Sequence, residues 1–395
     1  MPGCCLSLSG VRERESIMLP ASKTVHVFSV IPRLSYLLRE KLPDVEVVEV
    51  KLIGNIDGKY PKKVLQEEVA ALQEAEILLV DNSLLVQVVL KSSGYNIKSV
   101  LQIFACRNLL KNSRRWGLPE LPPDGSQGHH SYHSVNTLIY LNPNLKHPNL
   151  ACYLKPRPTF PITRMASESF SQLMAEYAVG WIISHERGLL DCRMYQLKSE
   201  WGHKGNIVNY RSLRELAVGV LGMGIIGKEV ARSLKSFNTT VHAYTRTAPT
   251  VENKSNNVDK YWHTGELLSF LQQCDYMINI MPSTPETRGM LGNDTLKDAK
   301  KDAVFINIGR GDVINEADII KALDYGWISA AILDVFVQEP LSPESLLWKH
   351  PKVMITPHSS GISRAVDVAE AFVANFRRYT QGFPIQNTLD FDRGY

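Results

Sequence analysis

The chain lacks any apolar run long enough to suggest a membrane span. No stretch approaches the ~18 consecutive apolar residues that such a helix needs. It also lacks a run of basic residues, because 44 Lys and Arg against 40 Asp and Glu give a net charge of only +4. Proteins that bind nucleic acid usually concentrate basic residues on one face. We therefore expect neither a membrane nor nucleic acid as a partner.

Cysteine is scarce, with six residues that show no metal-ligand spacing. Only Cys4 and Cys5 lie close together, and two adjacent cysteines make a poor zinc site. We therefore expect no metal. Free thiols in a reducing compartment are the simplest interpretation of this pattern.

Residues 1–23 lack the apolar periodicity of the later chain, and we expect them to form an unstructured leader. Arg12 and Arg14 would suit a transit peptide, but Glu13 and Glu15 alternate with them, and such peptides contain few acids. This pattern favours a cytoplasmic protein, with a mitochondrial location as the alternative.

From Thr24 onward, apolar segments of strand length alternate with segments of helical periodicity. The candidate strands are 25–30, 45–51, 75–80, 217–221, 240–244, 274–280, 303–308 and 329–335. Helices are expected at 34–41, 169–185, 228–237 and 364–380. This alternation predicts an α/β protein with a doubly wound parallel sheet and right-handed crossovers.

A glycine-rich turn follows the candidate strand 217–221 and opens a helix. It consists of Gly222, Met223, Gly224, Ile225, Ile226 and Gly227. In this pattern the first glycine permits a tight turn, the second lets the backbone approach a pyrophosphate, and the third allows close packing of helix on strand. The helix N-terminus adds N–H donors and positive potential. The context favours a dinucleotide site over a purely structural turn.

The end of the next strand indicates which dinucleotide is preferred. Sites that prefer NAD usually carry an acid about 20 residues after the glycine turn, where it bonds the ribose hydroxyls. Here Thr245 and Arg246 stand at that place, and neither is acidic. Arg246 with the Thr245 hydroxyl could bind a 2′-phosphate. We therefore predict NADP, with NAD possible; the alternative is that Arg246 is a solvated loop residue.

Three polar residues follow later strands of the same expected sheet. Arg310 follows FINI, Glu339 follows AAILDVF, and His358 follows VMIT. Each has an ordinary structural explanation when taken alone. Ligands of open α/β sheets bind outside the carboxyl ends of the strands, however, and all three residues fall there.

The segments around these residues resemble the D-isomer-specific 2-hydroxyacid dehydrogenases. They read ELAVGVLGMGIIGKEVA, MPSTPETRGML, FINIGRGDVINEADIIKAL, AAILDVFVQEPL and LWKHPKVMITPHSSG. The ending NTLDFDRGY is similar to the glyoxylate/hydroxypyruvate reductase A branch. The resemblance covers about 158–395 well and 25–110 only loosely.

This resemblance implies a catalytic set. Arg310 would hold the substrate carboxylate and polarise the keto group. His358 would give a proton to the carbonyl oxygen as hydride reaches the neighbouring carbon. Glu339 would orient the imidazole and favour its protonated form. The implied reaction is NADPH-dependent reduction of a small 2-keto acid, glyoxylate or hydroxypyruvate, to the D-2-hydroxy acid.

The resemblance also implies further cofactor contacts. These are Met281, Pro282, Thr287, Ile308, Gly309 and Asp334, together with Arg310 and His358 themselves. Pro282 and Thr287 would lie near the adenosine, and Ile308 and Asp334 near the nicotinamide. A strand-end cap is an almost equally good interpretation of Asp334.

The implied architecture has two domains. A disordered leader at 1–23 precedes a smaller, discontinuous, flavodoxin-like α/β substrate domain at 24–160, which contains a disordered insertion at 107–155. The Rossmann cofactor domain covers 161–365, and 366–395 forms a crossover helix and tail that return to the substrate domain. Family members are usually homodimers, so we expect a homodimer, with the helix around 174–177 at its interface.

The sequence departs from the family at Cys106, where a glycine is expected in a loop whose amides help to hold the carboxylate. Arg107 and the insertion follow directly. A catalytically weak paralogue and a dinucleotide-sensing binding protein are therefore alternatives. A NAD-linked dehydrogenase for a bulkier keto acid is a third, although an acid at position 245, which would favour it, is absent.

Overall fold

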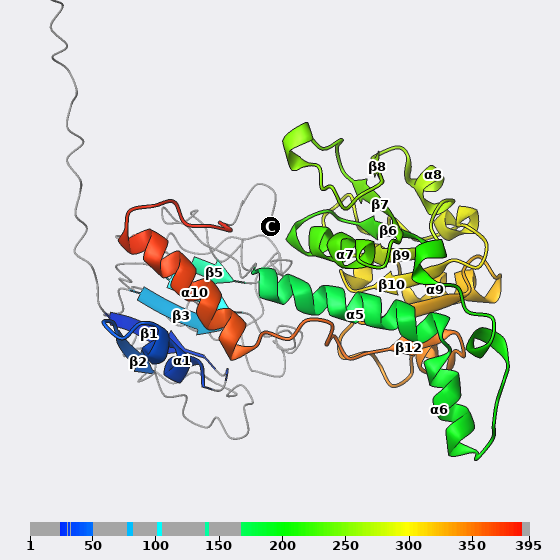
Figure 1. Cartoon of the computed structure of the whole chain (residues 1–395), viewed down its shortest axis with the longest axis horizontal. Coiled ribbons are helices and arrows are strands. Elements are labelled where there is room, and N and C mark those ends of the chain that lie inside the picture. Colours follow the sequence, from blue (N-terminus) through cyan, green and yellow to red (C-terminus); the bar gives the residue numbers. More distant parts are fainter. Residues whose placement is uncertain are drawn as a thin grey trace, which may run out of the picture.

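The computed structural model describes residues 24–29, 31, 33–49, 77–81, 101–104, 139–141 and 167–388. Within these residues the chain forms two parallel sheets, each in its own lobe, and the long helix α5 runs from one lobe across the other (Figure 1). The expected leader at 1–23, Cys106, Arg107 and the expected insertion apart from 139–141 lie outside the described residues.

The first sheet has five strands in the order β2-β1-β3-β4-β5, all parallel. The strands are β1 (Thr24–Phe28), β2 (Glu46–Glu49), β3 (Ile77–Asp81), β4 (Leu101–Phe104) and β5 (Ile139–Leu141). This is the flavodoxin-like order, which confirms the fold expected for the smaller domain. β5 falls in the segment that shows no clear pattern, because three residues are too few to show periodicity.

The second sheet has seven strands in the order β12-β11-β10-β9-β6-β7-β8, again all parallel. Its strands are β6 (Ala217–Leu221), β7 (Thr240–Thr245), β8 (Lys260–His263), β9 (Tyr276–Asn279), β10 (Val304–Asn307), β11 (Ala330–Leu333) and β12 (Val353–Ile355). The order reverses between β6 and β9, which makes that point the expected ligand crevice. The doubly wound Rossmann prediction is thereby confirmed.

The central strands of this sheet read as continuous apolar runs because both faces are covered. β9, β10 and β11 are buried at every position. The edge strand β8 was not predicted, since two of its four residues, Lys260 and His263, are exposed and polar. An edge strand of that composition carries little apolar signal.

The helices connect these strands. They are α1 (Leu34–Lys41), α5 (Glu168–Glu186), α6 (Leu189–Leu197), α7 (Ile225–Lys235), α8 (Leu267–Leu271), α9 (Glu316–Asp324) and α10 (Ala365–Thr380). Short 3-10 helices occur at Gly205–Ile207, Leu213–Glu215, Val251–Asn253, Thr295–Asp298, Gly311–Val313 and Leu346–Lys349. No helix of the described residues has the length and apolar character of a membrane span.

After β12 the chain leaves the larger sheet and forms α10, which packs against α1 of the smaller lobe (Figure 1). Lys41 of α1 and Glu370 of α10 form an ion pair with an Nζ–Oε1 distance of 3.3 Å. Phe372 and Val368 of α10 are buried in the same core cluster as Leu34 and Leu38 of α1. The smaller lobe is therefore built from residues at both ends of the described chain.

Candidate active site

The glycine-rich turn joins β6 to α7 at the switch point of the larger sheet. Gly222 has a φ of 106°, which favours glycine. A Cβ on Gly227 would meet the carbonyl oxygen of Gly222 at 2.0 Å, so that position requires close packing. A Cβ on Gly224, by contrast, would meet no atom within 4 Å. The turn thus has two structural glycines and one that faces open space, as a cradle for a pyrophosphate requires.

The other residues of the turn lie as a ligand site would need. Gly224 is the N-cap of α7, and it is exposed together with Ile225. Met223 and Ile226 are partly buried and pack against the core. The helix begins at Ile225, three residues before the start predicted from sequence, so its first N–H groups point out beside the open glycine.

Thr245 is the last residue of β7, and Arg246 follows it. The Thr245 hydroxyl donates to the carbonyl of Thr247 at 2.8 Å, so its hydrogen serves the turn while its oxygen can still accept a bond. The side chain of Arg246 is exposed. Both residues lie at the carboxyl edge of the sheet, one strand away from the glycine turn.

The loop after β9 carries Met281, Pro282 and Thr287. Met281 is buried, and its N–H lies 3.2 Å from where a Cβ of Gly222 would be. The Thr287 hydroxyl donates to the Pro282 carbonyl at 2.7 Å and accepts from the N–H of Thr284 at 2.8 Å. Thr287 therefore closes this loop on itself beside the glycine turn.

Two buried asparagines, which we did not predict, position the loops after β9 and β10. Asn279 donates to the Oδ1 of Asn307 at 2.9 Å, and its own Oδ1 accepts from Met281 N–H at 3.1 Å. Asn307 also accepts from Gly309 N–H and donates to the Arg310 carbonyl at 3.0 Å. The available signal was that consecutive apolar strands, YMIN and VFIN, both end in Asn.

Arg310 follows β10 and its side chain is partly buried, with a guanidinium N–H directed at the carbonyl of Gly309. Gly309 packs against the neighbouring loop, because a Cβ there would lie 2.9 Å from the Met281 carbonyl oxygen. A Cβ on Gly311 would meet the Phe336 carbonyl carbon at 2.0 Å. The loop that carries Arg310 is thus wedged between the loops that follow β9 and β11.

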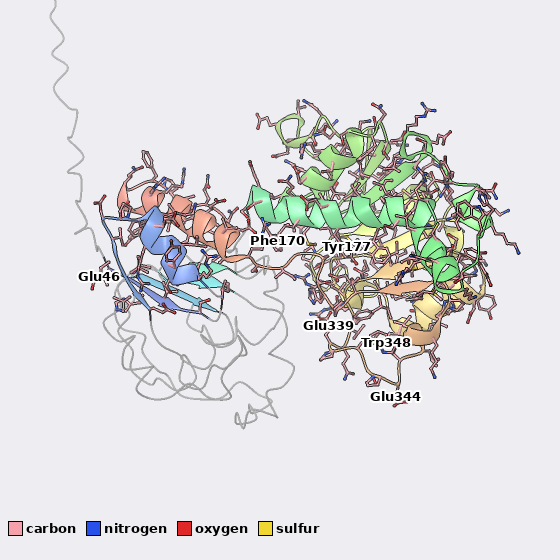
Figure 2. All side chains as sticks on the ribbon, turned by 60° about the horizontal axis from the view of Figure 1, so that its bottom comes forward. Glu46, Phe170, Tyr177, Glu339, Glu344 and Trp348 are labelled. Atoms are coloured by element: carbon pink, nitrogen blue, oxygen red, sulfur yellow. The ribbon has the colours of Figure 1, made fainter. Side chains whose placement is uncertain are left out.

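Glu339 and His358 form a direct pair. His358 Nδ1 and Glu339 Oε2 are 2.7 Å apart, and both side chains are largely buried, at 7% and 14% exposure. The other carboxylate oxygen of Glu339 accepts the N–H of Phe336 at 2.9 Å. With Nδ1 on the carboxylate, the imidazole directs Nε2 toward any substrate. In Figure 2 Glu339 lies on the side of the larger lobe nearer the smaller one.

His358 has a left-handed backbone, with a φ of 56°. Such a conformation is uncommon for residues other than glycine and gathers at functional sites. Asp334 holds it: the two oxygens of this fully buried carboxylate accept the N–H groups of Ser359 and Ser360, at 2.6 and 3.0 Å. The carboxylate of Asp334 thus caps the loop after β12, as one of the two sequence interpretations of this residue had it.

A second chain of bonds reaches the same loop from α5. The Thr356 hydroxyl donates to Asp334 Oδ1 at 2.6 Å, and Tyr177 lies 2.6 Å from Thr356 Oγ1. Burial of the phenol, the largest cause, raises the pKa of Tyr177 to about 12. The hydroxyl of Tyr177 on α5 (Figure 2) supports the His358 loop from within the chain, and the dimer interface expected at this helix stays a prediction.

Ile308 belongs to the core, with only 2% of the residue exposed, and its N–H donates to the Asn279 carbonyl. A cofactor contact at this position would therefore come from the backbone. Arg310, Glu339 and His358 thus follow the ends of neighbouring strands, and Glu339 and His358 are in direct contact. Their catalytic roles stay a prediction. The expected substrate loop at Cys106 lies outside the described residues.

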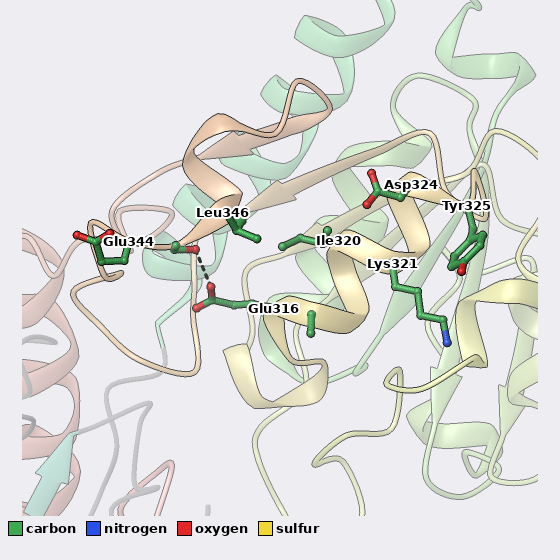
Figure 3. Close-up of a pocket in the computed structure, with 9 residues that line it drawn as sticks. Glu316, Ile320, Lys321, Asp324, Tyr325, Glu344 and Leu346 are labelled. Carbon is green, nitrogen blue, oxygen red and sulfur yellow. Dashed lines mark hydrogen bonds between the residues drawn. The ribbon is translucent and has the colours of Figure 1, made fainter.

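A separate cavity of about 650 Å³ lies on the outer side of α9 (Figure 3). Glu316, Ile320 and Lys321 of this helix line it, together with Leu346. Ser345 also lines the cavity and donates to Glu316 Oε2 at 2.6 Å. None of the residues predicted for the active site lines this cavity, so we do not assign it to the reaction.

Known proteins share this fold. The chain is similar to a D-isomer specific 2-hydroxyacid dehydrogenase from Xanthobacter autotrophicus Py2, solved with NADPH and MES (25% identity, TM-score 0.66, 95% of this chain and 100% of that one). It is also similar to an NADPH-dependent glyoxylate/hydroxypyruvate reductase from Sinorhizobium meliloti in complex with NADP and sulfate (24%, 0.65, 94% and 99%). A family protein from Aeromonas salmonicida aligns with a TM-score of 0.69 at 24% identity, over 94% of this chain and 100% of that one.

A family model agrees with these structures. Residues 179–360 match the model of the NAD binding domain of D-isomer specific 2-hydroxyacid dehydrogenases. That range contains the glycine turn, Arg310, Glu339 and His358. The resemblance predicted from sequence is confirmed by this family model and by the D-isomer specific 2-hydroxyacid dehydrogenase structures to which the chain is similar.

Proposed function

We propose that this chain is an NADPH-preferring reductase that converts glyoxylate or hydroxypyruvate to the corresponding D-2-hydroxy acid. The observation that carries the proposal is the His358–Glu339 pair, held next to the Arg310 loop at the carboxyl edge of a dinucleotide-binding sheet. A nearly buried acid–imidazole pair with one ring nitrogen directed away from the acid is suited to proton transfer.

The cofactor site fits a dinucleotide. The open face of Gly224 and the first N–H groups of α7 would hold the pyrophosphate. Thr245 and Arg246 would meet the adenosine ribose, where the guanidinium matches a 2′-phosphate. When bound, the nicotinamide supplies the hydride.

The protein residues perform the rest of the reaction. Arg310 binds the substrate carboxylate through two parallel hydrogen bonds, which fixes the face of the keto group that is presented to the cofactor. His358 transfers a proton from Nε2 to the carbonyl oxygen. Glu339 holds Nδ1, fixes the ring orientation and stabilises the imidazolium before transfer. In the oxidative direction the same imidazole accepts the proton.

The names of two relatives support the proposed substrate class and cofactor. The Sinorhizobium meliloti protein is named an NADPH-dependent glyoxylate/hydroxypyruvate reductase, and the Xanthobacter autotrophicus structure contains NADPH. Both align over nearly the whole of this chain. A single carboxylate-binding arginine suits these small keto acids.

Loss of reduced-nicotinamide absorbance tests the proposal, with glyoxylate and hydroxypyruvate each assayed with NADPH and NADH. We expect turnover that favours NADPH and is lost in Arg310→Gln. Arg232→Ala is the matched control, because Arg232 is exposed on α7 and its guanidinium forms an ion pair with Glu229. Tight dinucleotide binding without turnover would favour the sensing protein instead.

We also propose that the protein is a homodimer that pairs through the arm formed by residues 189–210. α6 has no buried residue, and the arm exposes large apolar side chains at Leu189, Leu190, Met194, Leu197, Trp201, Val208 and Tyr210. So many exposed large apolar side chains on one short segment favour an interface there. Sedimentation should give a dimer for the wild type and a monomer for Leu197→Glu; a monomeric wild type would refute this part.

A further inference from the structure

Glu286 is an acidic residue in the loop that follows β9, whereas the end of β7, at Thr245 and Arg246, carries no acid. The sheet brings this second loop to the same edge. β7 and β9 flank β6, and adjacent strands lie about 4.8 Å apart, so the ends of β7 and β9 are separated by about 10 Å. Arg246 follows the end of β7 directly, and Glu286 lies in the loop that follows β9.

The glycine turn lies between these two strand ends. The N–H of Gly222 donates to the Tyr244 carbonyl at 3.0 Å on one side. On the other side, a Cβ on Gly222 would lie 3.2 Å from the N–H of Met281. A dinucleotide seated on this turn therefore has the β7 end and the β9 loop on either side of it.

The β9 loop holds Glu286 in place on the surface. The two bonds of the Thr287 hydroxyl, to Pro282 and Thr284, close the loop around Glu286. A hydrogen bond from Thr284, the main cause, and then its own backbone N–H lower the pKa of Glu286, and the positive charge of Arg246 lowers it further. The exposed carboxylate is thus ionised and within electrostatic reach of Arg246.

We infer that Glu286 is a specificity-determining residue, which opposes Arg246 in the choice between the two nicotinamide dinucleotides. The inference rests on the proposed function. Arg246 attracts the 2′-phosphate of NADP(H), whereas the Glu286 carboxylate repels it and can accept the 2′-hydroxyl of NAD(H). The pair therefore makes the preference for NADP moderate and leaves NAD(H) able to bind.

Direct binding tests this without turnover. The dissociation constants of NADP⁺ and NAD⁺ are measured by tryptophan fluorescence for the wild type, Glu286→Gln and Glu344→Gln. Glu344 is the matched control, an exposed acid at the cavity on α9. We expect the preference for NADP⁺ over NAD⁺ to rise about fivefold in Glu286→Gln, equal to about 1 kcal/mol, and to stay unchanged in the control.

The possible results separate the inference from the proposed function. An unchanged preference in Glu286→Gln, in a protein that binds dinucleotide, overturns the role of Glu286 and leaves the reductase proposal intact. A wild type that binds neither dinucleotide overturns both. High salt should reduce the difference between the wild type and Glu286→Gln, since exposed charges are screened; an effect that persists at high salt would point to a rearranged loop and against the inference.

Discussion

Buried charges lie at both ends of the strands of the seven-stranded sheet. We call the end where the strands begin the amino edge and the end where they finish the carboxyl edge, and the charges at the two edges have different roles. At the amino edge, Glu186 accepts three bonds from Arg211, including Arg211 Nη2 at 2.6 Å, and Arg211 Nη1 also bonds Asp275 at 2.9 Å. Asp275 in turn accepts the N–H of Ala217, the first residue of β6, and the ammonium of Lys300. Each carboxylate oxygen of Glu186 and Asp275 accepts at least one hydrogen bond from the protein.

The carboxyl edge has the features of a ligand-binding site. Gly224 faces open space, His358 has a left-handed backbone, and Arg246 is exposed. The polar side chains of Asp334 and Asn307 at this edge bond backbone groups and so hold the loops in place. The comparison indicates that the amino edge contributes stability, whereas the strained and accessible site at the carboxyl edge lowers it.

The largest expected effect is a loss of turnover when His358 at the carboxyl edge is replaced. His358→Asn removes the proton donor but keeps a residue that tolerates the left-handed backbone. We expect the turnover number per folded molecule to fall about 10²- to 10⁴-fold, the usual contribution of general acid catalysis. Some stability should also be lost, because Glu339 loses its buried partner. Steady-state assays and a melting curve on the same preparation measure both. An active His358→Asn enzyme would remove His358 from the mechanism.

The reverse effect is expected at the amino edge. Glu186→Gln leaves Arg211 without its main partner, and loss of one member of a buried pair costs about 3–5 kcal/mol. Because the Arg211 side chain is 39% exposed, we expect about 2–3 kcal/mol of lost stability after allowing for solvent screening. The turnover number per folded molecule should stay at the wild-type level. A stable but inactive variant would show that the edges are not separate.

The sequence predicted the carboxyl edge better than the amino edge. Arg310, Glu339 and His358 follow three neighbouring strands, so strand order alone brings them together. The network of Glu186 and Arg211 joins residues whose separation along the chain carries no pattern. Asn279 and Asn307 were not predicted, although each ends an apolar strand, because that position alone does not show which loops their side chains bond. The strand β8 was missed because its exposed polar residues hide its period.

Two glycines of the carboxyl edge allow a matched test of structure against ligand binding. Gly311→Ala would force a Cβ to within 2.0 Å of the Phe336 carbonyl carbon, so we expect a loss of about 1–3 kcal/mol of stability. Gly224→Ala meets no protein atom, and we expect unchanged stability but weaker dinucleotide binding. Urea unfolding and cofactor titration compare the two. Equal dinucleotide affinity in Gly224→Ala and wild type would contradict the assigned cradle.

The smallest expected effect is a pH dependence of stability from the amino edge. Burial, the largest cause, lowers the pKa of His185, and the ring lies 2.7 Å from the Tyr276 hydroxyl. Tyr276 donates its hydrogen to Glu186, so His185 donates from Nδ1 while neutral. The unfolded chain binds the proton more readily, and stability should therefore fall as the pH drops below about 6.5.

His185→Gln isolates this contribution. It keeps a donor near Tyr276 but cannot titrate, so its stability should fall less than that of the wild type between about pH 7 and pH 5. His242, whose pKa is also lowered mainly by burial, acts in the same direction in both proteins and cancels in the difference. Glu186 has a lowered pKa as well, because the bonds from Arg211 and Tyr276 outweigh the opposing effect of burial. Its protonation adds a further loss only at lower pH, so parallel curves above pH about 5 would show that His185 is not the titrating group.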